Sequence, residues 1–307
     1  MPDITVSVQA EPSDLNSWLA LARRLESSGF QALLMGDHPG TGASPWPALG
    51  CAAAVTQTLN LGTCVLQGGV REPMHAVADA VSLDVLAPGR VLLGIGAGHT
   101  PREWQDIGQD RPAPADRARR LAEFVDAAAQ LLNGDTVSYE GRYLTLRGSQ
   151  LDGLPGGDRV RLAVGGGHPE VLRAAARHAD VVGLSGLGRT LADGHHHEVR
   201  WSRADLLRQL QLVREEAQRA GNEPVVEALV QNVTVTGDRA AVSQDISGRV
   251  QGATAEDIAS TPFLLFGSYQ EMADQLRAQA EEFGVTSYVV RQQAVPDLER
   301  VLAILRS

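Results

Sequence analysis

The chain has 307 residues, of which 43% are hydrophobic, and its formal net charge is −10. A chain of this length can bury a large core, and its acidic balance argues against nucleic acid as a partner. No apolar run approaches the length of a membrane span, and no basic and apolar signal segment precedes the first strand-like residues. We therefore expect a cytoplasmic protein that forms one domain over residues 1–307, with no membrane contact.

The first part of the chain alternates between apolar strand patterns and helical patterns. Asp14 is a favourable N-cap residue, and Gly29 is a favourable residue directly after a helix, so the first helix is predicted between them. Pro88 and Gly89 end the third helix, and a polar loop is expected over residues 100–109. Strands are predicted at residues 4–9, 31–35, 59–66 and 90–95, and helices at residues 15–28, 45–58, 72–86 and 114–132.

The second part continues the alternation, with three insertions. A hairpin with a turn at Glu140 and Gly141 is predicted near residues 135–150, outside the main sheet. Residues 186–202 are expected to form a loop, and residues 238–264 a polar and weakly helical excursion. Strands are predicted at residues 160–164, 181–184, 225–236 and 285–291. The helices that follow them are predicted to start at residue 169 and to span residues 203–220, 268–283 and 296–305.

Eight strands that alternate with helices indicate a parallel sheet, and this number favours a closed (β/α)8 TIM barrel. An open doubly wound sheet is the alternative. In a barrel, binding and catalytic groups lie on the loops that follow the strands, so the residues at these strand ends are the candidates for a site.

Gly165, Gly166 and Gly167 stand between a predicted strand and a helix whose first turn holds Pro169. Glycines let the backbone approach a ligand closely, and the free N–H groups of a helix start bind phosphate. The dinucleotide pattern G-x-G-x-x-G is missing, so the turn predicts a site for one phosphate. The alternative is a turn that is merely tight.

Five segments in this order resemble the luciferase-like monooxygenase (bacterial luciferase) superfamily, and most closely its deazaflavin-dependent branch. They read ARRLESSGFQALLMGDH, SPWPALGCAAAVTQTLNLGTCVL, HAVADAVSLDVLAPGRVLLGIGAG, AVGGGHPEVLRAAARHADVVGL and FGSYQEMADQLRAQAEEFGVTSYVV. The resemblance implies coenzyme F420, with FMN as the alternative, bound across the barrel mouth. The cofactor-binding residues that we expect are Gln9, His38, Cys64, Val65, Gly98, Gly165, Gly166, Gly167, Leu184 and Ser185.

The same resemblance implies two catalytic candidates and one backbone feature. His38, at the end of the second strand, matches a histidine that relatives keep beside the ring, where it can donate or orient a proton. The alternative is that His38 bonds Asp37 or the backbone. Glu103 is placed like an acidic residue of relatives. The run LGTCVL matches relatives with a cis peptide bond, which we expect between Cys64 and Val65.

Other polar residues have weaker signals. Arg71, Arg102, Arg189 and Arg291 follow strands and are candidates for the anionic tail of a deazaflavin, with plain solvation as the alternative. His195, His196 and His197 are adjacent on a loop, a spacing that does not favour a metal site.

Two further features concern the thiols and the surface of the protein. Cys51 and Cys64 lie in apolar stretches, which fits reduced thiols. Apolar residues on several faces of the helices at 48–55 and 74–85 predict a homodimer.

The leading interpretation is an F420-dependent oxidoreductase that transfers a hydride between C5 of the deazaflavin and a small organic substrate. The first alternative is an FMN-dependent monooxygenase that uses the same phosphate site. The second is a cofactor-free barrel that binds a ligand without catalysis. The substrate-binding loops are too irregular in sequence to identify the substrate.

Overall fold

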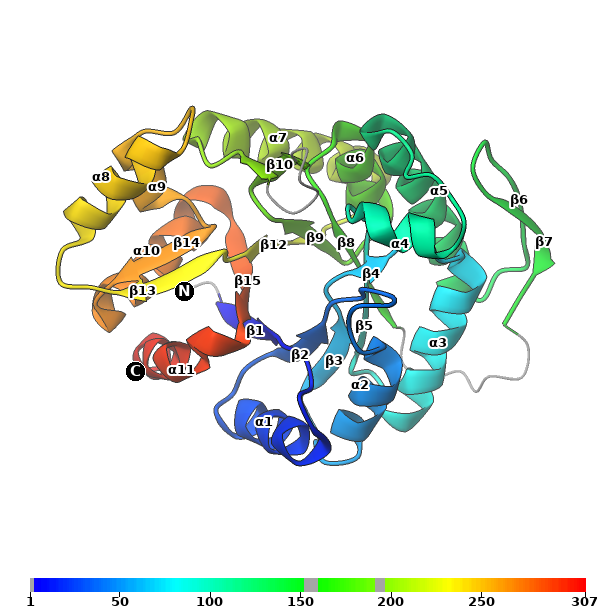
Figure 1. The fold of residues 1–307 in the computed structure, drawn as a ribbon, viewed down its shortest axis with the longest axis horizontal. Helices are drawn as coiled ribbons and strands as arrows, with labels where there is room; N and C mark the ends of the chain where they lie inside the picture. The colour runs from blue at the N-terminus through cyan, green and yellow to red at the C-terminus, as the bar shows by residue number, and fades with distance from the viewer. Residues whose placement is uncertain (1–2, 152–159, 191–196) are drawn as a thin grey trace.

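Within residues 3–151, 160–190 and 197–307, which the computed structural model describes, eight parallel strands close into a barrel (Figure 1). The pairing of β1 with β15 and of β3 with β5 closes the ring. The predicted (β/α)8 barrel is confirmed, because an open doubly wound sheet would leave two strand edges unpaired. The barrel strands are β1 (Thr5–Gln9), β2 (Ala32–Met35), β3 (Asn60–Thr63), β5 (Val91–Gly96), β8 (Arg161–Gly165), β9 (Val181–Leu184), β12 (Val225–Leu229) and β15 (Val285–Arg291).

Helices surround the barrel, and their ends carry the expected signals. The side chain of Asp14 accepts a hydrogen bond from Ser17 N at 3.0 Å, and Gly221 and Gly284 end their helices in the left-handed conformation. The main helices are α1 (Leu15–Ser27), α2 (Pro45–Ala53), α3 (Pro73–Leu86), α5 (Pro114–Leu132), α6 (Pro169–His178), α7 (Arg203–Ala220), α10 (Tyr269–Phe283) and α11 (Val295–Leu305), the last preceded by the turn η1 (Gln292–Ala294).

The core has two layers. The large layer lies between the outer faces of the strands and the helices. The small layer fills the inside of the barrel with Leu34, Leu92 and Val289, among others. Because both faces of a strand such as β2 are buried, its sequence is a continuous apolar run without polar alternation.

Two predicted strands are interrupted. The third strand stops at Thr63 and resumes as β4 (Leu66–Gln67), and the peptide bond between Cys64 and Val65 is cis, which confirms that expectation. The continuous seventh strand predicted at residues 225–236 is wrong. After β12 the chain leaves the barrel, Gln231 N donates to the Phe263 carbonyl at 2.7 Å, and β13 (Asn232–Val235) pairs with β14 (Leu264–Gly267) instead.

The segments between barrel units contain more regular structure than their sequences indicate. The hairpin is present as β6 (Val137–Glu140) and β7 (Thr145–Ser149). The expected loop at residues 100–109 contains α4 (Pro101–Asp106), and the expected loop after Gly186 contains the antiparallel pair β10 (Leu187–Thr190) and β11 (His197–Val199). The polar excursion folds into α8 (Arg239–Arg249) and α9 (Ala255–Ser260). The hairpin was predicted from the sequence. The other elements were not, because α4, α9, β10 and β11 are too short for a periodic apolar pattern and α8 is mostly polar.

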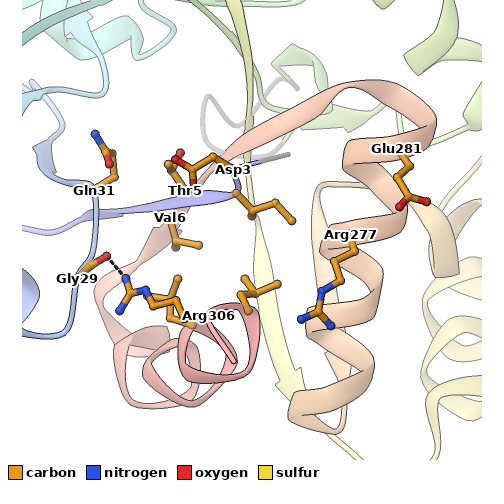
Figure 2. A pocket seen from close by; sticks show the side chains of 11 residues that line it. Asp3, Thr5, Val6, Gly29, Gln31, Arg277, Glu281 and Arg306 are labelled. Atoms are coloured by element: carbon orange, nitrogen blue, oxygen red, sulfur yellow. Dashed lines mark hydrogen bonds between the residues drawn. The ribbon is translucent and has the colours of Figure 1, made fainter. Parts of the chain in front are cut away.

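A cavity of about 350 Å³ opens at the amino-terminal end of the strands, between β1, α10 and α11 (Figure 2). The two arginines of its wall donate to backbone carbonyls. Arg306, at the end of α11, donates to the carbonyls of Ser28 and Gly29, and Arg277 donates to the Ile304 carbonyl at 3.0 Å. These bonds hold the last helix on the barrel, at the end where barrel enzymes keep stability rather than catalysis.

Candidate active site at the carboxyl ends of the strands

A cavity of about 790 Å³ opens at the carboxyl ends of the barrel strands. Its volume suits a ligand as large as a cofactor ring. The expected cofactor-binding and catalytic residues all lie in its wall, including residues that are more than 150 positions apart in the chain. These are Gln9, His38, Cys64, Val65, Gly98, Glu103, Gly165, Gly166, Gly167, Leu184 and Ser185.

His38 and Glu103 form a hydrogen-bonded pair in this wall. His38 follows β2, Glu103 lies in the first turn of α4, and Nδ1 of the imidazole is 2.8 Å from Oε1 of the carboxylate. The Glu103 side chain is 2% exposed, and that of His38 is 39% exposed. The hydrogen bond to Glu103 raises the pKa of His38, and burial opposes this effect. His38 therefore bonds Glu103 and not Asp37, which was the alternative from the sequence.

Gln67 holds the second oxygen of Glu103, and sequence reasoning missed it. Its Nε2 donates to Glu103 Oε2 at 2.7 Å, and its Oε1 accepts from Gly69 N at 2.8 Å. Gly98 lies against the same amide, because a Cβ at Gly98 would be 1.9 Å from Gln67 Oε1. The signal in the sequence is a polar residue directly after the third strand, where barrel sites are built.

Asp37 and Arg71 form an ion pair beside these residues. Arg71 Nε lies 2.6 Å from Asp37 Oδ2, and Nη2 lies 2.7 Å from Oδ1. The backbone N–H of Gln67 also donates to Asp37, at 3.0 Å. The bonds to Asp37 raise the pKa of Arg71. Arg71 therefore orders the strand ends through the Nε and Nη2 edge of its guanidinium, and its role in holding an anionic tail stays a prediction.

The glycine turn lies between β8 and α6, as the sequence indicated. Gly166 N donates to the Gly183 carbonyl at 3.1 Å, which anchors the turn to β9. A Cβ at Gly165 would lie 3.1 Å from Val65 Cγ1, and one at Gly166 would lie 3.0 Å from Val171 Cγ1. The turn thus admits only glycine without displacement of its neighbours. It presents its backbone to the cavity at the start of a ten-residue helix.

Two further histidines lie along the same wall. The ring of His99 is 6.1 Å from that of His38 and 5.1 Å from that of His197, in edge-to-face arrangements. Burial lowers the pKa of His99 to about 4, and the neighbouring histidines add to this effect. His99 is therefore neutral near pH 7. In the described part of the chain, no group of three side chains could hold a metal ion, and His195 and His196 lie outside that part.

Arginines line the cavity in a protein whose net charge is negative. Arg189 and Arg291 were expected there, whereas Arg102 pairs with Asp106 on the surface. A cleft lined by cationic side chains concentrates anionic ligands by its local field. The arginines of the wall are Arg111, Arg117, Arg189, Arg200 and Arg291.

The cis peptide bond lies in the wall of the cavity, where Gln9 Nε2 donates to the Cys64 carbonyl. Gln9 Oε1 is buried and has no hydrogen-bond partner among the described residues. Burial raises the pKa of the Cys64 thiol to about 12, so this thiol is not a nucleophile near neutral pH. Both cysteines are free, in agreement with the expected reduced thiols.

The described residues include no helix that is long and apolar enough to cross a membrane.

Comparison with known proteins identifies a family whose model matches most of the chain. The model of the luciferase-like monooxygenase family matches residues 2–287. The F420-dependent glucose-6-phosphate dehydrogenase of Beutenbergia cavernae is 34% identical over 196 residues, which are 60% of this chain and 56% of that protein. The 4-hydroxyprotoasukamycin monooxygenase of Streptomyces nodosus subsp. asukaensis is 38% identical over 131 residues, which are 41% of this chain and 34% of that protein. The matched segments thus span about half of these curated relatives or less.

Solved structures share the fold over nearly the whole chain. An F420-dependent secondary alcohol dehydrogenase in complex with an F420–acetone adduct has a TM-score of 0.74 at 18% identity, covering 99% of this chain and 100% of that one. A long-chain alkane monooxygenase has a TM-score of 0.73 at 16% identity, covering 100% of this chain and 92% of that one. At these identities the likeness establishes the barrel fold alone.

Proposed function

The chain belongs to the luciferase-like monooxygenase family, and from that premise we propose that it is an oxidoreductase that uses coenzyme F420. The observation that carries the proposal is the His38–Glu103 pair in the wall of a cavity that also contains a glycine turn at a helix start. The matched F420-dependent dehydrogenase supports the choice of cofactor. Its substrate is a property of that protein and is not carried over to this chain.

The residues of the cavity fit such a cofactor. Gln9 Oε1 is a buried acceptor without a partner among the described residues, as expected of a group that accepts a hydrogen bond from a ligand N–H. Gly165, Gly166 and Gly167 would hold the phosphate, with Ser185 nearby on the neighbouring strand end. The arginines of the wall would favour the anionic tail of F420. The bound ring supplies the hydride chemistry at C5, which explains why the protein needs no nucleophile.

His38 would hold or move the proton that accompanies hydride transfer. Its Nδ1 is occupied by Glu103, which leaves Nε2 for a substrate oxygen. A Cβ at Gly36 would lie 3.7 Å from His38 Nε2 and 3.4 Å from Gln9 Nε2, and both side chains line the cavity. Glu103 favours the imidazolium form, so a larger fraction of His38 carries the proton to be donated near neutral pH.

An FMN-dependent monooxygenase is the second candidate. The family model bears that description, and a matched relative is a monooxygenase at 38% identity. Both cofactors carry a phosphate and a tricyclic ring, so the same glycine turn would serve either.

Titration of the purified protein with each cofactor separates these functions. We expect fluorescence quenching with F420 at micromolar concentrations or below, and weaker binding of FMN. Tighter binding of FMN, with oxygen consumption on reduction, would replace the first function by the second. Binding of neither cofactor would leave a barrel without this chemistry and overturn both.

The role of His38 is tested by His38→Asn and Glu103→Gln. We expect both variants to bind F420 within about threefold of wild type. Hydride transfer should fall about 100-fold or more, because a positioned acid contributes roughly 10²–10⁴ to the rate. The direct measure is single-turnover oxidation of the reduced cofactor with a panel of small carbonyl and unsaturated compounds.

A further inference from the structure

Glu227 is a buried carboxyl group that the site described above does not use. It lies on β12, two residues before the carboxyl end of the strand, and its exposed fraction is 8%. Two residues of strand correspond to about 7 Å, so Glu227 lies deeper in the barrel than the strand-end residues around it. The sequence offers one signal, which is an acidic residue inside the apolar run VVEALV.

Glu227 has one close partner in the described structure. Ser287, opposite it on β15, donates its hydroxyl to Oε2 at 2.8 Å. No other hydrogen bond or ion pair joins Glu227 to a described residue, and the second carboxyl oxygen, which is not fully buried, is open to the cavity. A buried carboxylate without a cation is costly, and such a group takes up a proton instead.

The charged surroundings agree with a neutral carboxyl group. Burial raises the pKa of Glu227, and the bond from Ser287 and the charge of Arg161 on β8 only partly oppose this. Arg161 is too distant for an ion pair. Arg291, at the end of β15, and the Cys64 thiol are the other titratable groups near this layer, and burial keeps the thiol protonated. A protonated carboxyl group has one O–H donor.

The cavity reaches down to this donor. Glu227 lines it together with Leu34, Leu92, Ala163 and Leu229, which are apolar and have nothing to accept its proton. We infer that Glu227 is a cofactor-contacting residue that donates a hydrogen bond to a carbonyl oxygen or ring nitrogen at the buried end of the bound heterocycle. The inference rests on the proposed function, because it requires a planar heterocycle in this cavity.

The donor complements the acceptor at Gln9 Oε1. A deazaflavin or flavin ring carries both carbonyl oxygens and a ring N–H, so a cavity that binds it needs donors and an acceptor. Gln9 Nε2 donates one of its two N–H groups to the Cys64 carbonyl. Glu227 supplies a donor inside the barrel that no other residue of that apolar layer provides among those described.

Three variants test this inference. Glu227→Gln stays neutral and keeps an N–H donor, Glu227→Met keeps the volume without a donor, and Ser287→Ala removes the bond between the strands but leaves the carboxyl group. Leaving a buried acceptor of the ring unsatisfied weakens binding by about tenfold. We expect Glu227→Met to raise the Kd for F420 about tenfold and to shift the absorption maximum of the bound cofactor. Glu227→Gln and Ser287→Ala should stay within about threefold of wild type.

A second measurement does not depend on activity. The infrared spectrum of the protein without cofactor should contain the carbonyl band of a protonated carboxylic acid, absent from Glu227→Gln. The band should move when F420 is added.

Each outcome decides the inference. Equal Kd values and spectra for wild type and Glu227→Met would overturn it while the proposed function stands. Equal losses in Ser287→Ala and Glu227→Met would assign Glu227 to strand packing alone. If FMN binds instead of F420, the same comparison with FMN decides. If wild type binds neither cofactor, the inference and the proposed function fail together.

Discussion

Replacing Gly98 by alanine tests how much the buried hydrogen bonds of Gln67 contribute to the free energy of unfolding. Gly98 has a φ of +71°, and a Cβ there would lie 1.9 Å from Oε1 and 2.2 Å from Nε2 of Gln67. The Gln67 side chain would have to leave its place. Glu103 would then lose a donor at 2.7 Å, and Gly69 N would lose an acceptor at 2.8 Å.

The expected loss of stability is the sum of three contributions. A positive φ for alanine costs about 1–2 kcal/mol. A lost hydrogen bond to a buried carboxylate costs about 1.5–3 kcal/mol, and a lost bond between neutral groups costs about 0.5–1.5 kcal/mol. Gly98→Ala should therefore lower the free energy of unfolding by about 3–6.5 kcal/mol.

Gly134→Ala is the matched control. Gly134 has a φ of +82°, and a Cβ there would meet nothing within 4 Å. The free energy of unfolding of Gly134→Ala should fall only by the cost of a positive φ for alanine, about 1–2 kcal/mol. Urea unfolding followed by circular dichroism measures both variants, and a Gln67→Ala background should reduce the effect of Gly98→Ala to that of the control. Equal losses in the two alanine variants would refute the reasoning.

Three other outcomes follow from the site and the surface. Glu103→Gln should lower the pKa of His38, measured by NMR titration, because the bond to Glu103 raises it. The raised pKa of His38 stabilises the fold fully at pH values below the pKa of histidine in the unfolded chain. This contribution is lost as the pH rises through the pKa of folded His38, so the difference in free energy of unfolding between wild type and Glu103→Gln should narrow over that range. Gly167→Asp should abolish F420 binding in a fluorescence titration by placing a carboxylate in the phosphate site, whereas Gly237→Asp, in open space, should not. Leu86→Glu should convert a dimer into a monomer in sedimentation, because Leu86 is 67% exposed on α3.

These outcomes can each be contradicted. An unchanged His38 titration in Glu103→Gln would remove the coupling between the two groups. Cofactor affinity of Gly167→Asp equal to that of Gly237→Asp would remove the phosphate assignment. A wild-type protein that sediments as a monomer at micromolar concentration would contradict the predicted homodimer, whatever Leu86→Glu does.

The sequence by itself determined the barrel and the end at which its site lies. Long elements such as α5 and β5 have strong apolar patterns, and the eight alternations require a parallel arrangement. The glycine turn at Gly165 also follows from local sequence, because a strand, three glycines and a helix start are contiguous. The cis bond at Cys64 was expected from family resemblance alone, since nothing in local periodicity predicts it.

The tertiary structure decided which side chains meet. His38 and Glu103 are 65 positions apart, and Glu227 and Ser287 are 60 apart. Their contacts depend on the closure of the barrel and on the path of α4, a six-residue helix with no periodic signal. Periodicity indicates which face of an element is buried, but it does not indicate which polar groups face one another across the barrel. The partners of Gln67 and the single partner of Glu227 are therefore properties of packing, and they are known only once all the neighbours of these side chains are in place.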